Sequence, residues 1–307
     1  MTMLTSGDIL AASTSSRATA CRWLDRIDTW LDTEPALHAM ADDRFLEALE
    51  AFEGSSNQRE QIAAKLTSWS PSGDESPGDR PDALRWLSIG CGGGDLDAMV
   101  ARAFADEHAR QHYVGIDPNP VECARCRKLF AALPGSIEAT VVAKPFEAFD
   151  GEADSFDLIY AAHTFYYVTD VERTVGDVER LLRPGGELIV LQAPLGALNQ
   201  LANRFWEARL SRSVPYSDTI EQRLRALRPS VRRFRIEAEL DVTACLGSGD
   251  HTDDHGRAVL DFILQLDTSR LPPEVQKDVR AYLGAISRPD GARWLAPHPV
   301  DGFVLTA

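Results

Sequence analysis

Residues 84–97 read LRWLSIGCGGGDLD, and this stretch decides the fold. It begins as an apolar run that contains Trp86, Leu87 and Ile89 and stops at Gly90, which is followed by further glycines at 92–94. Beyond the glycines, apolar residues return at the three- and four-residue spacing of a helix. The pattern predicts a strand, a glycine turn and a helix. The turn offers bare backbone N–H groups at the helix start, where a ligand can approach the chain closely.

The spacing of the glycines narrows the choice of ligand. The dinucleotide fingerprint G-x-G-x-x-G would need a third glycine at position 95, which is Asp95. A phosphate-binding loop needs G-K-[ST], and that motif does not follow here. The pattern present is G-x-G-x-G, at Gly90, Gly92 and Gly94. Taken alone, it also fits an ordinary tight turn between a strand and a helix.

Composition restricts the possible partners. The 307 residues are 44% hydrophobic and 26% charged, as in a globular protein of one large domain or two small ones. The net charge of −15 makes nucleic acid an unexpected partner, because phosphate binding needs a basic surface, whereas it favours a cationic small substrate. Five cysteines, no basic–apolar leader and no apolar run of membrane-spanning length predict a cytoplasmic protein that does not use a membrane.

An acidic residue follows the second predicted strand. That strand covers residues 113–116 and ends at Asp117 and Pro118. A carboxylate in this position can accept hydrogen bonds from both hydroxyl groups of a ribose. The alternative is an aspartate that simply forms a turn before proline.

Further strands are predicted at 136–142, 156–161 and 187–192, with helices at 94–105, 121–133 and 171–182 and a turn at 183–186. This alternation indicates a parallel sheet with helices on both faces, and ligands bind beyond the carboxyl ends of such strands. Phe146 and His163 follow the third and fourth strands. Phe146 is expected either to stack on an adenine ring or to anchor the core. His163 is expected to line a pocket or to serve as a capping or core residue.

The flanking segments are predicted to be largely helical. Helices are expected within residues 1–70 and at 198–210, 217–227, 257–266 and 273–283, with a linker at 70–82, strand-like material at 231–246 and a last strand at 303–307. Trp23 and Trp30 pack in a core or form an aromatic wall over a substrate pocket. No metal site is predicted. Cys123 and Cys126 are incidental helix positions, and the loop with His251, Asp253, Asp254 and His255 has no metal-ligand spacing.

Three motifs together resemble the class I S-adenosylmethionine (SAM) methyltransferases: LSIGCGGG at 87–94, IDP at 116–118 and LLRPGGELIV at 181–190. The resemblance implies an α/β, Rossmann-like fold with a mostly parallel seven-stranded sheet. It also implies SAM as cofactor and S-adenosylhomocysteine as product. We expect a helical N-terminal cap and linker over residues 1–82 and the methyltransferase domain over 83–307. Helical insertions at about 195–230 and 250–290 would form the substrate lid.

A narrower resemblance, from about Glu34 to the end, is to histamine N-methyltransferase and its relatives. It rests on LSIG…GDLD, on HTFYYVTD at 163–170 and on the acid-rich loop before residue 258. The implied acceptor contacts are Glu34, His163 and His298, the last two replacing Gln and Asn of that family. These departures put histamine itself in doubt. The implied cofactor contacts are Gly90, Cys91, Gly92, Gly94, Asp117, Pro118, Glu122, Phe146 and Ala162.

We therefore expect methyl transfer from SAM to a nitrogen of a small cationic amine, imidazole, guanidine or amino acid, which must react in its neutral form. In this interpretation Glu34 attracts the cation, and His163 or His298 takes its proton. Alternatives remain for two of these residues. Glu34 before Pro35 also fits the acidic first turn of a helix, and His298 between two prolines also fits a surface loop. Alternative functions are O-methylation of a small natural product and SAM binding without catalysis.

Overall fold

The computed structural model describes residues 21–68, 83–106, 108–210, 214–247 and 252–307. The chain divides into two compact units. The first, which we call the sheet unit, comprises residues 59–194, 215–236 and 300–307. The second, the helical unit, comprises residues 1–58, 195–214 and 237–299. Each unit is thus built from three separate segments of the chain.

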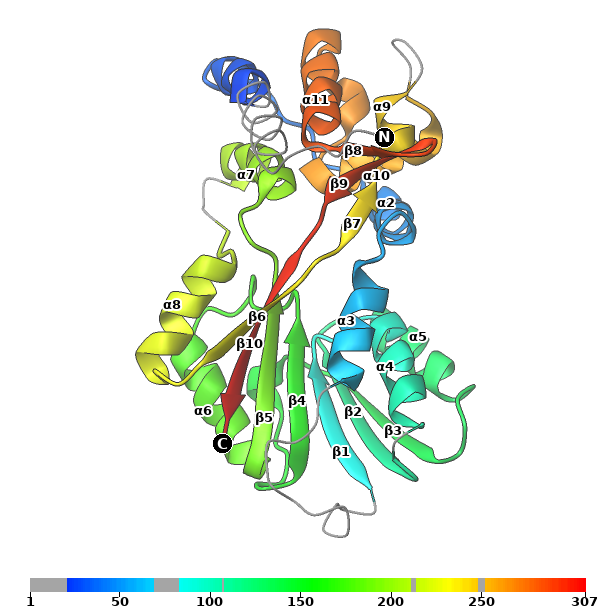
Figure 1. Ribbon diagram of the computed structural model, residues 1–307, viewed down its shortest axis with the longest axis vertical. Helices are drawn as coiled ribbons and strands as arrows, with labels where there is room; N and C mark the ends of the chain where they lie inside the picture. Colours follow the sequence, from blue (N-terminus) through cyan, green and yellow to red (C-terminus); the bar gives the residue numbers. More distant parts are fainter. Residues whose placement is uncertain (1–20, 69–82, 107, 211–213, 248–251) are drawn as a thin grey trace, which may run out of the picture. The chain divides into compact units, whose positions relative to one another are not determined.

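The sheet unit contains a seven-stranded sheet in the order β3-β2-β1-β4-β5-β10-β6 (Figure 1). All neighbouring pairs are parallel except those of β10, which runs antiparallel to both β5 and β6. This confirms the mostly parallel seven-stranded sheet expected from the sequence. The strands are β1 (Leu84–Ile89), β2 (Gln111–Asp117), β3 (Ile137–Ala143), β4 (Phe156–Ala162), β5 (Leu182–Gln192), β6 (Arg232–Ile236) and β10 (Val300–Thr306). The helices are α3 (Gln58–Thr67), α4 (Asp95–Phe104), α5 (Pro120–Phe130), η1 (Phe146–Ala148), α6 (Val171–Leu181) and α8 (Ser217–Leu227).

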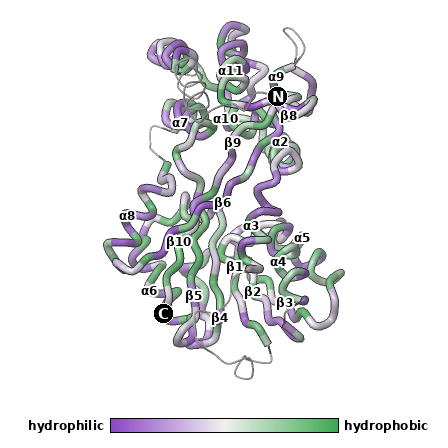
Figure 2. Tube along the Cα trace, in the orientation of Figure 1, coloured by the Kyte–Doolittle hydropathy of each residue, from purple (hydrophilic) through white to green (hydrophobic). Residues whose placement is uncertain are grey.

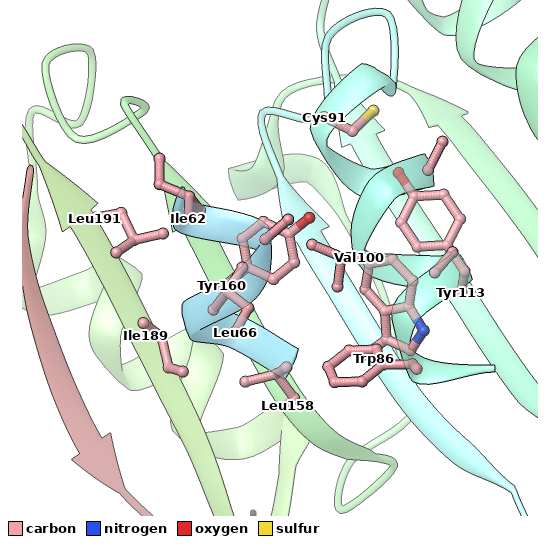
Figure 3. Packing of buried hydrophobic residues seen from close by; sticks show 14 of the residues in the cluster. Ile62, Leu66, Trp86, Cys91, Val100, Tyr113, Leu158, Tyr160, Ile189 and Leu191 are labelled. Carbon is pink, nitrogen blue, oxygen red and sulfur yellow. The ribbon is translucent and has the colours of Figure 1, made fainter. Parts of the chain in front are cut away.

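Both faces of the sheet are covered, which explains why its central strands are mostly apolar (Figure 2). Neighbouring residues of β1 point to opposite faces. Trp86 packs in one cluster with residues of α3, α4 and α5, part of which Figure 3 shows. Leu87 and Ile89 pack in the other cluster with residues of α6 and α8. Hydrophobic clusters on both faces of the sheet therefore fix the edge at which the parallel strands end.

The helical unit has its own core, formed by helices and a small antiparallel sheet in the order β7-β9-β8. The sequence did not predict this sheet, because strands of three to five residues are too short to show a period. The elements are a helix over residues 21–31, α2 (Asp42–Gly54), α7 (Ala197–Leu210), β7 (Glu239–Asp241), α9 (Thr243–Leu246), α10 (Asp254–Leu264), η2 (Thr268–Arg270), α11 (Pro273–Ile286), β8 (Arg288–Asp290) and β9 (Arg293–Pro297).

One sequence expectation needs correction, and the compact units differ from the expected domain bounds. Residues 183–186 were expected to form a turn before a strand at 187–192, but they lie inside β5. They form an irregularity there, since Phe156 pairs with Leu182 while Leu158 pairs with Glu187. The compact units also divide the chain differently from the expected domains. Helices α3 and α8 belong to the sheet unit, although the sequence placed them in the N-terminal cap and in an insertion. The predicted linker at 70–82 lies outside the described residues.

Candidate functional site

The glycine turn follows β1 and is fastened to the neighbouring strand. The N–H groups of Gly90 and Cys91 both donate to the carbonyl oxygen of Ile116 on β2, at 2.7 and 3.0 Å. Gly90, Gly92 and Gly94 all have positive φ angles, of 76°, 50° and 83°, which glycine adopts without strain. Gly94 then accepts the first hydrogen bond of α4 from the N–H of Ala98. The G-x-G-x-G spacing is thus a backbone requirement of this turn.

The three glycines have different surroundings. A Cβ atom at Gly90 would collide with the side chain of Thr164, and one at Gly94 would lie 2.6 Å from Cys126 Sγ. A Cβ atom at Gly92 would meet no heavy atom of the described chain within 4 Å. Gly90 and Gly94 are therefore required by the packing of the protein itself. The space next to Gly92 is open to a ligand.

Asp117 faces this open part of the turn. Its Oδ2 accepts a hydrogen bond from the N–H of Gly92 at 3.1 Å, and its Oδ1 accepts one from the N–H of Asn119 at 2.8 Å. A carboxylate has about four lone-pair directions, so these two bonds leave two of them for a ligand. The aspartate does form a turn, as the alternative interpretation required. The same contacts also orient it beside Gly92, so the turn and ligand roles are compatible.

Thr164 occupies the point where the strand order reverses, between β1 and β4. Ligands of open α/β sheets bind at this point. The hydroxyl group of Thr164 lies within hydrogen-bonding distance of two carbonyl oxygens, that of Ile89 on β1 at 2.9 Å and that of Ala162 on β4 at 3.1 Å. Sequence reasoning missed this residue, because its importance comes from contacts 75 positions away along the chain.

A buried carboxylate lies on the inner side of the same turn. Asp97, on the first turn of α4, is 2% exposed and accepts hydrogen bonds from the hydroxyl groups of Ser88, Tyr113 and Tyr160. Burial raises the pKa of Asp97 from 3.8 to about 6 despite these bonds. Sequence reasoning missed Asp97 as well. Its three partners lie 9, 16 and 63 positions away along the chain, so no local pattern identified it.

The other expected cofactor residues surround this turn in different ways. Cys91 packs its side chain in the core, where hydrogen bonding with Cys126 and burial raise the pKa of its thiol, so its backbone is what remains for a ligand (Figure 3). Phe146 is 9% exposed within the apolar cluster below η1, which favours the core-anchor interpretation. The remaining members, Pro118, Glu122 and Ala162, lie respectively after β2, on the first turn of α5 and at the end of β4.

His163 belongs to a group of aromatic side chains after β4. It has a positive φ of 54°, an uncommon conformation for a non-glycine residue, and its N–H donates to the carbonyl oxygen of Leu191 on β5 at 2.9 Å. Its ring stacks with Tyr166 at 6.2 Å between centroids, and Tyr166 also contacts the rings of Tyr167 and Tyr216. Burial, together with the nearby charge of Arg59, lowers the pKa of His163 from 6.5 to about 4. The imidazole is therefore neutral at ordinary pH.

Glu34 and His298 both lie in the helical unit. Glu34 is exposed and has a positive φ of 51°; it follows the helix over residues 21–31 and precedes α2 by several residues. It is not in the first turn of a helix, so that alternative is wrong.

His298 is 7% exposed, and its Nδ1 lies 2.8 Å from Ser56 Oγ, so the surface-loop alternative is also wrong. Phe52 packs edge-on against its ring, with 5.1 Å between centroids. Of the expected acceptor residues, the structure thus groups only His163 with the glycine turn in one compact unit.

The residues of the sheet unit fit SAM on their own geometry. Three features suit a cationic nucleoside. The space at Gly92 is open, and the carboxylate of Asp117 has two unused lone-pair directions. No described lysine or arginine is bonded to that carboxylate. Within the described ranges, no three His, Cys, Asp or Glu side chains are grouped to hold a metal ion. His251 of the acid-rich loop lies outside those ranges. No helix within the described ranges combines the length and the apolar character needed to cross a membrane.

Comparison with known proteins gives a match to one family model and to several curated relatives. Residues 87–188 match a model described as a methyltransferase domain. A sterol 4-C-methyltransferase of Caenorhabditis elegans is 32% identical over 34% of this chain and 29% of its own length. A ubiquinone biosynthesis O-methyltransferase of Hahella chejuensis is 32% identical over 34% of this chain and 41% of its own. A histamine N-methyltransferase of Xenopus tropicalis is 20% identical over 72% of this chain and 80% of its own.

These relatives differ in the atom that their names say they methylate. The chain spans less than half the length of the sterol and ubiquinone enzymes that it matches. The match to the family model, over residues 87–188, includes the glycine turn, β2 and β4. The family match therefore covers the part of the chain that contains the proposed cofactor residues, and it does not identify the methyl acceptor.

Proposed function

We propose that this chain transfers a methyl group from SAM to a nitrogen of a small, cationic acceptor, since residues 87–188 match a methyltransferase-domain model and the sheet is mostly parallel with seven strands. The acceptor class is an amine, imidazole, guanidine or amino acid that reacts in its neutral form. SAM supplies an electrophilic methyl group on a sulfonium. The chain has to hold that group, align the acceptor with it and exclude water.

For the cofactor, the proposal assigns the ribose hydroxyls to the carboxylate of Asp117 and the open space beside Gly92 to the rest of the nucleoside. The supporting observation is that Asp117 is already oriented by two backbone N–H groups, so little conformational freedom is lost on binding. No further positive charge is required of the protein, because the ligand is itself a cation.

For the acceptor, the proposal rests on one observation above all. Thr164 contacts Gly90 across the end of the sheet, and the residue before it, His163, begins the aromatic group with Tyr166, Tyr167 and Tyr216. Aromatic faces attract cations within about 6 Å by about 0.5–2 kcal/mol. They can thus bring an ammonium or guanidinium to the end of β4, where it must lose a proton before it reacts.

A neutral His163 matters for this step. Two like charges 4 Å apart repel by about 1 kcal/mol in water and by about 4 kcal/mol at an effective dielectric of 20. A protonated imidazole would add such a charge beside a sulfonium, whereas an imidazole with a pKa of about 4 does not. The low pKa favours His163 as a neutral hydrogen-bonding and stacking group over a long-lived proton acceptor. Glu34 and His298 remain proposed acceptor residues, to be tested by substitution.

An O-methyltransferase is the second candidate, supported by the 32% identity to the ubiquinone biosynthesis enzyme. A tyrosine-lined site also accepts a flat phenol ring. The test is a panel of amines, imidazoles, guanidines and phenols with SAM labelled in its methyl group. We expect label in nitrogen acceptors. Label in phenols alone would favour the second candidate, and SAM binding by calorimetry without any turnover would favour a non-catalytic protein.

His163→Gln sharpens the test, because Gln is the residue that the resemblance places here. We expect kcat to change with little change in SAM affinity, and Tyr167→Phe to serve as a control for a general effect on the aromatic group. The exposed Tyr167 (77%) contributes its face and not its hydroxyl in this proposal. If His163→Gln only lowers the melting temperature and leaves kcat unchanged, His163 is a core residue and not part of the site.

A further inference from the structure

A cavity of about 100 Å³ lies within the helical unit, and neither the glycine turn nor the aromatic group contributes to it. It lies between α10 and α11 and is bordered by η2 and the residues next to it, and we call it the α10–α11 cavity. Its apolar lining consists of Leu260, Leu264, Leu271 and Val279. These four side chains are all at least 90% buried, so this part of the cavity is a fixed piece of the core. Its polar lining consists of Thr252, Arg257, Thr268, Ser269, Gln276 and Arg280.

The charged residues that line this cavity are both basic. Two of the lining residues are arginines, Arg257 on α10 and Arg280 on α11, and no described lining residue is acidic. Arg257 has one described ion-pair partner, Asp254, which lies 3.6 Å away and is 92% exposed. Such an exposed pair binds weakly. No described residue forms an ion pair or hydrogen bond with the Arg280 side chain. Two guanidinium groups thus border one small cavity in a chain whose net charge is −15.

The hydrogen-bonding groups of the lining point to the same kind of ligand. Gln276 Nε2 donates one of its two N–H groups to the carbonyl oxygen of Leu271 at 2.7 Å. The hydroxyls of Thr268 and Ser269 are occupied, because they donate to Asp261 and Asp267. The hydroxyl oxygen of Thr252 is buried and has no hydrogen-bond partner in the described part of the chain. A buried hydroxyl normally has one. The lining therefore offers two cationic forks and one unused hydroxyl donor.

From this arrangement we propose that the α10–α11 cavity binds a small oxyanion, a carboxylate or a phosphate. The guanidinium groups of Arg257 and Arg280 contact its oxygens, since a planar fork of N–H donors matches both groups. The hydroxyl of Thr252 donates a further hydrogen bond. The apolar lining accommodates a short hydrocarbon chain. The size fits, because cavities of about 150 Å³ in other proteins admit benzene, whereas a nucleotide would not enter. This site is independent of the proposed methyl transfer.

The test is calorimetric titration of the full chain in a chloride buffer with inorganic phosphate and, separately, with acetate and butyrate. We expect saturable binding of at least one of these anions at one site per chain. Tighter phosphate binding identifies a phosphate ligand. Affinity that rises from acetate to butyrate identifies a carboxylate with a short chain, because the added methylenes reach the apolar lining.

Variants connect the binding to this cavity. Arg280→Gln and Arg257→Gln should each weaken binding at least tenfold, and Thr252→Val should weaken it by a smaller factor. Lys277→Gln is the matched control, since Lys277 lies on α11 with Arg280, is an exposed cation and does not line the cavity. Circular dichroism shows whether each variant is folded. No saturable binding of any of the anions, or an equal loss in Lys277→Gln, would overturn the proposal.

Discussion

Two aspartates flank the glycine turn, and their surroundings are opposite. Asp117, on the outer side, is partly exposed and is held by two backbone N–H groups, with lone pairs left over. Asp97, on the inner side, is 2% exposed and is surrounded by three hydroxyl donors. The same type of side chain thus has two different roles on the two sides of one turn. The outer aspartate is available to a ligand, and the inner one fastens the turn to β1, β2 and β4.

The largest expected effect comes from removing the inner carboxylate. Asp97→Ala leaves the hydroxyls of Ser88, Tyr113 and Tyr160 without their shared acceptor in the core, and each buried unsatisfied group costs about 1–3 kcal/mol. We expect the free energy of unfolding in urea to fall by about 3 kcal/mol or more. The control is Asp95→Ala, two residues away, where the lost ion pair with Arg125 is partly exposed and should cost less than about 1 kcal/mol. Equal losses in the two variants would remove the distinction.

The next effect is a pH dependence of stability that belongs to Asp97. Well below pH 3.8 its carboxyl is protonated in both the folded and the unfolded chain, so the raised pKa does not affect stability there. Above its folded pKa of about 6, the folded chain must carry the charged form. The difference between these pKa values corresponds to about 3 kcal/mol. The wild type should therefore lose stability relative to Asp97→Asn as the pH rises from about 4 to about 6.

Subtracting the two urea-unfolding profiles isolates this contribution, because other groups titrate alike in both proteins. His163 is one such group and acts in the opposite direction. Its lowered folded pKa, about 4, makes the folded chain lose stability as the pH falls below 6.5. The contributions of Asp97 and His163 can offset each other, so a wild-type free energy of unfolding that does not change with pH is compatible with both pKa shifts. A flat difference profile would contradict the buried state of Asp97.

Removing the outer carboxylate should act on binding. Asp117→Ala is expected to weaken SAM affinity by about 1.5–3 kcal/mol, the usual range for hydrogen bonds to a charged group, with a smaller effect on unfolding. Isothermal calorimetry measures this loss. Glu138→Ala, an exposed acid on β3, removes the same charge and should leave SAM affinity unchanged. An unaltered affinity in Asp117→Ala would exclude this residue from the cofactor site.

Gly92→Ala should change stability much less than Asp97→Ala does. The added Cβ meets no described atom, and the cost of a positive φ in alanine is about 1 kcal/mol. SAM affinity should nevertheless fall, because the methyl group would occupy the space proposed for the ligand. Gly90→Ala should be more destabilising, because the side chain of Thr164 would have to move. Normal SAM affinity in a folded Gly92→Ala variant would show that the ligand does not use this space.

The sequence predicted the parts of the fold that have a period or a fixed spacing. The parallel strands, the glycine turn and Asp117 were found because an apolar run, G-x-G-x-G and IDP are local signals. Asp97, Thr164 and the burial of His298 were not predicted, because each depends on partners far along the chain. The β7-β9-β8 sheet was missed because its strands are too short. The roles of Glu34, His163 and His298 stay predictions, because a resemblance assigns them and no contact with a ligand has been observed.

The most direct test of the central claim, that Asp117 binds the ribose of the cofactor, is a double-mutant cycle with the ligand as one partner. S-adenosylhomocysteine and its 2′,3′-dideoxyribose analogue are titrated into the wild type and into Asp117→Ala. We predict that the loss of the hydroxyls weakens binding at least tenfold in the wild type and has almost no effect in the variant. An equal loss in both proteins would contradict the claim, because the hydroxyls would then be bound elsewhere.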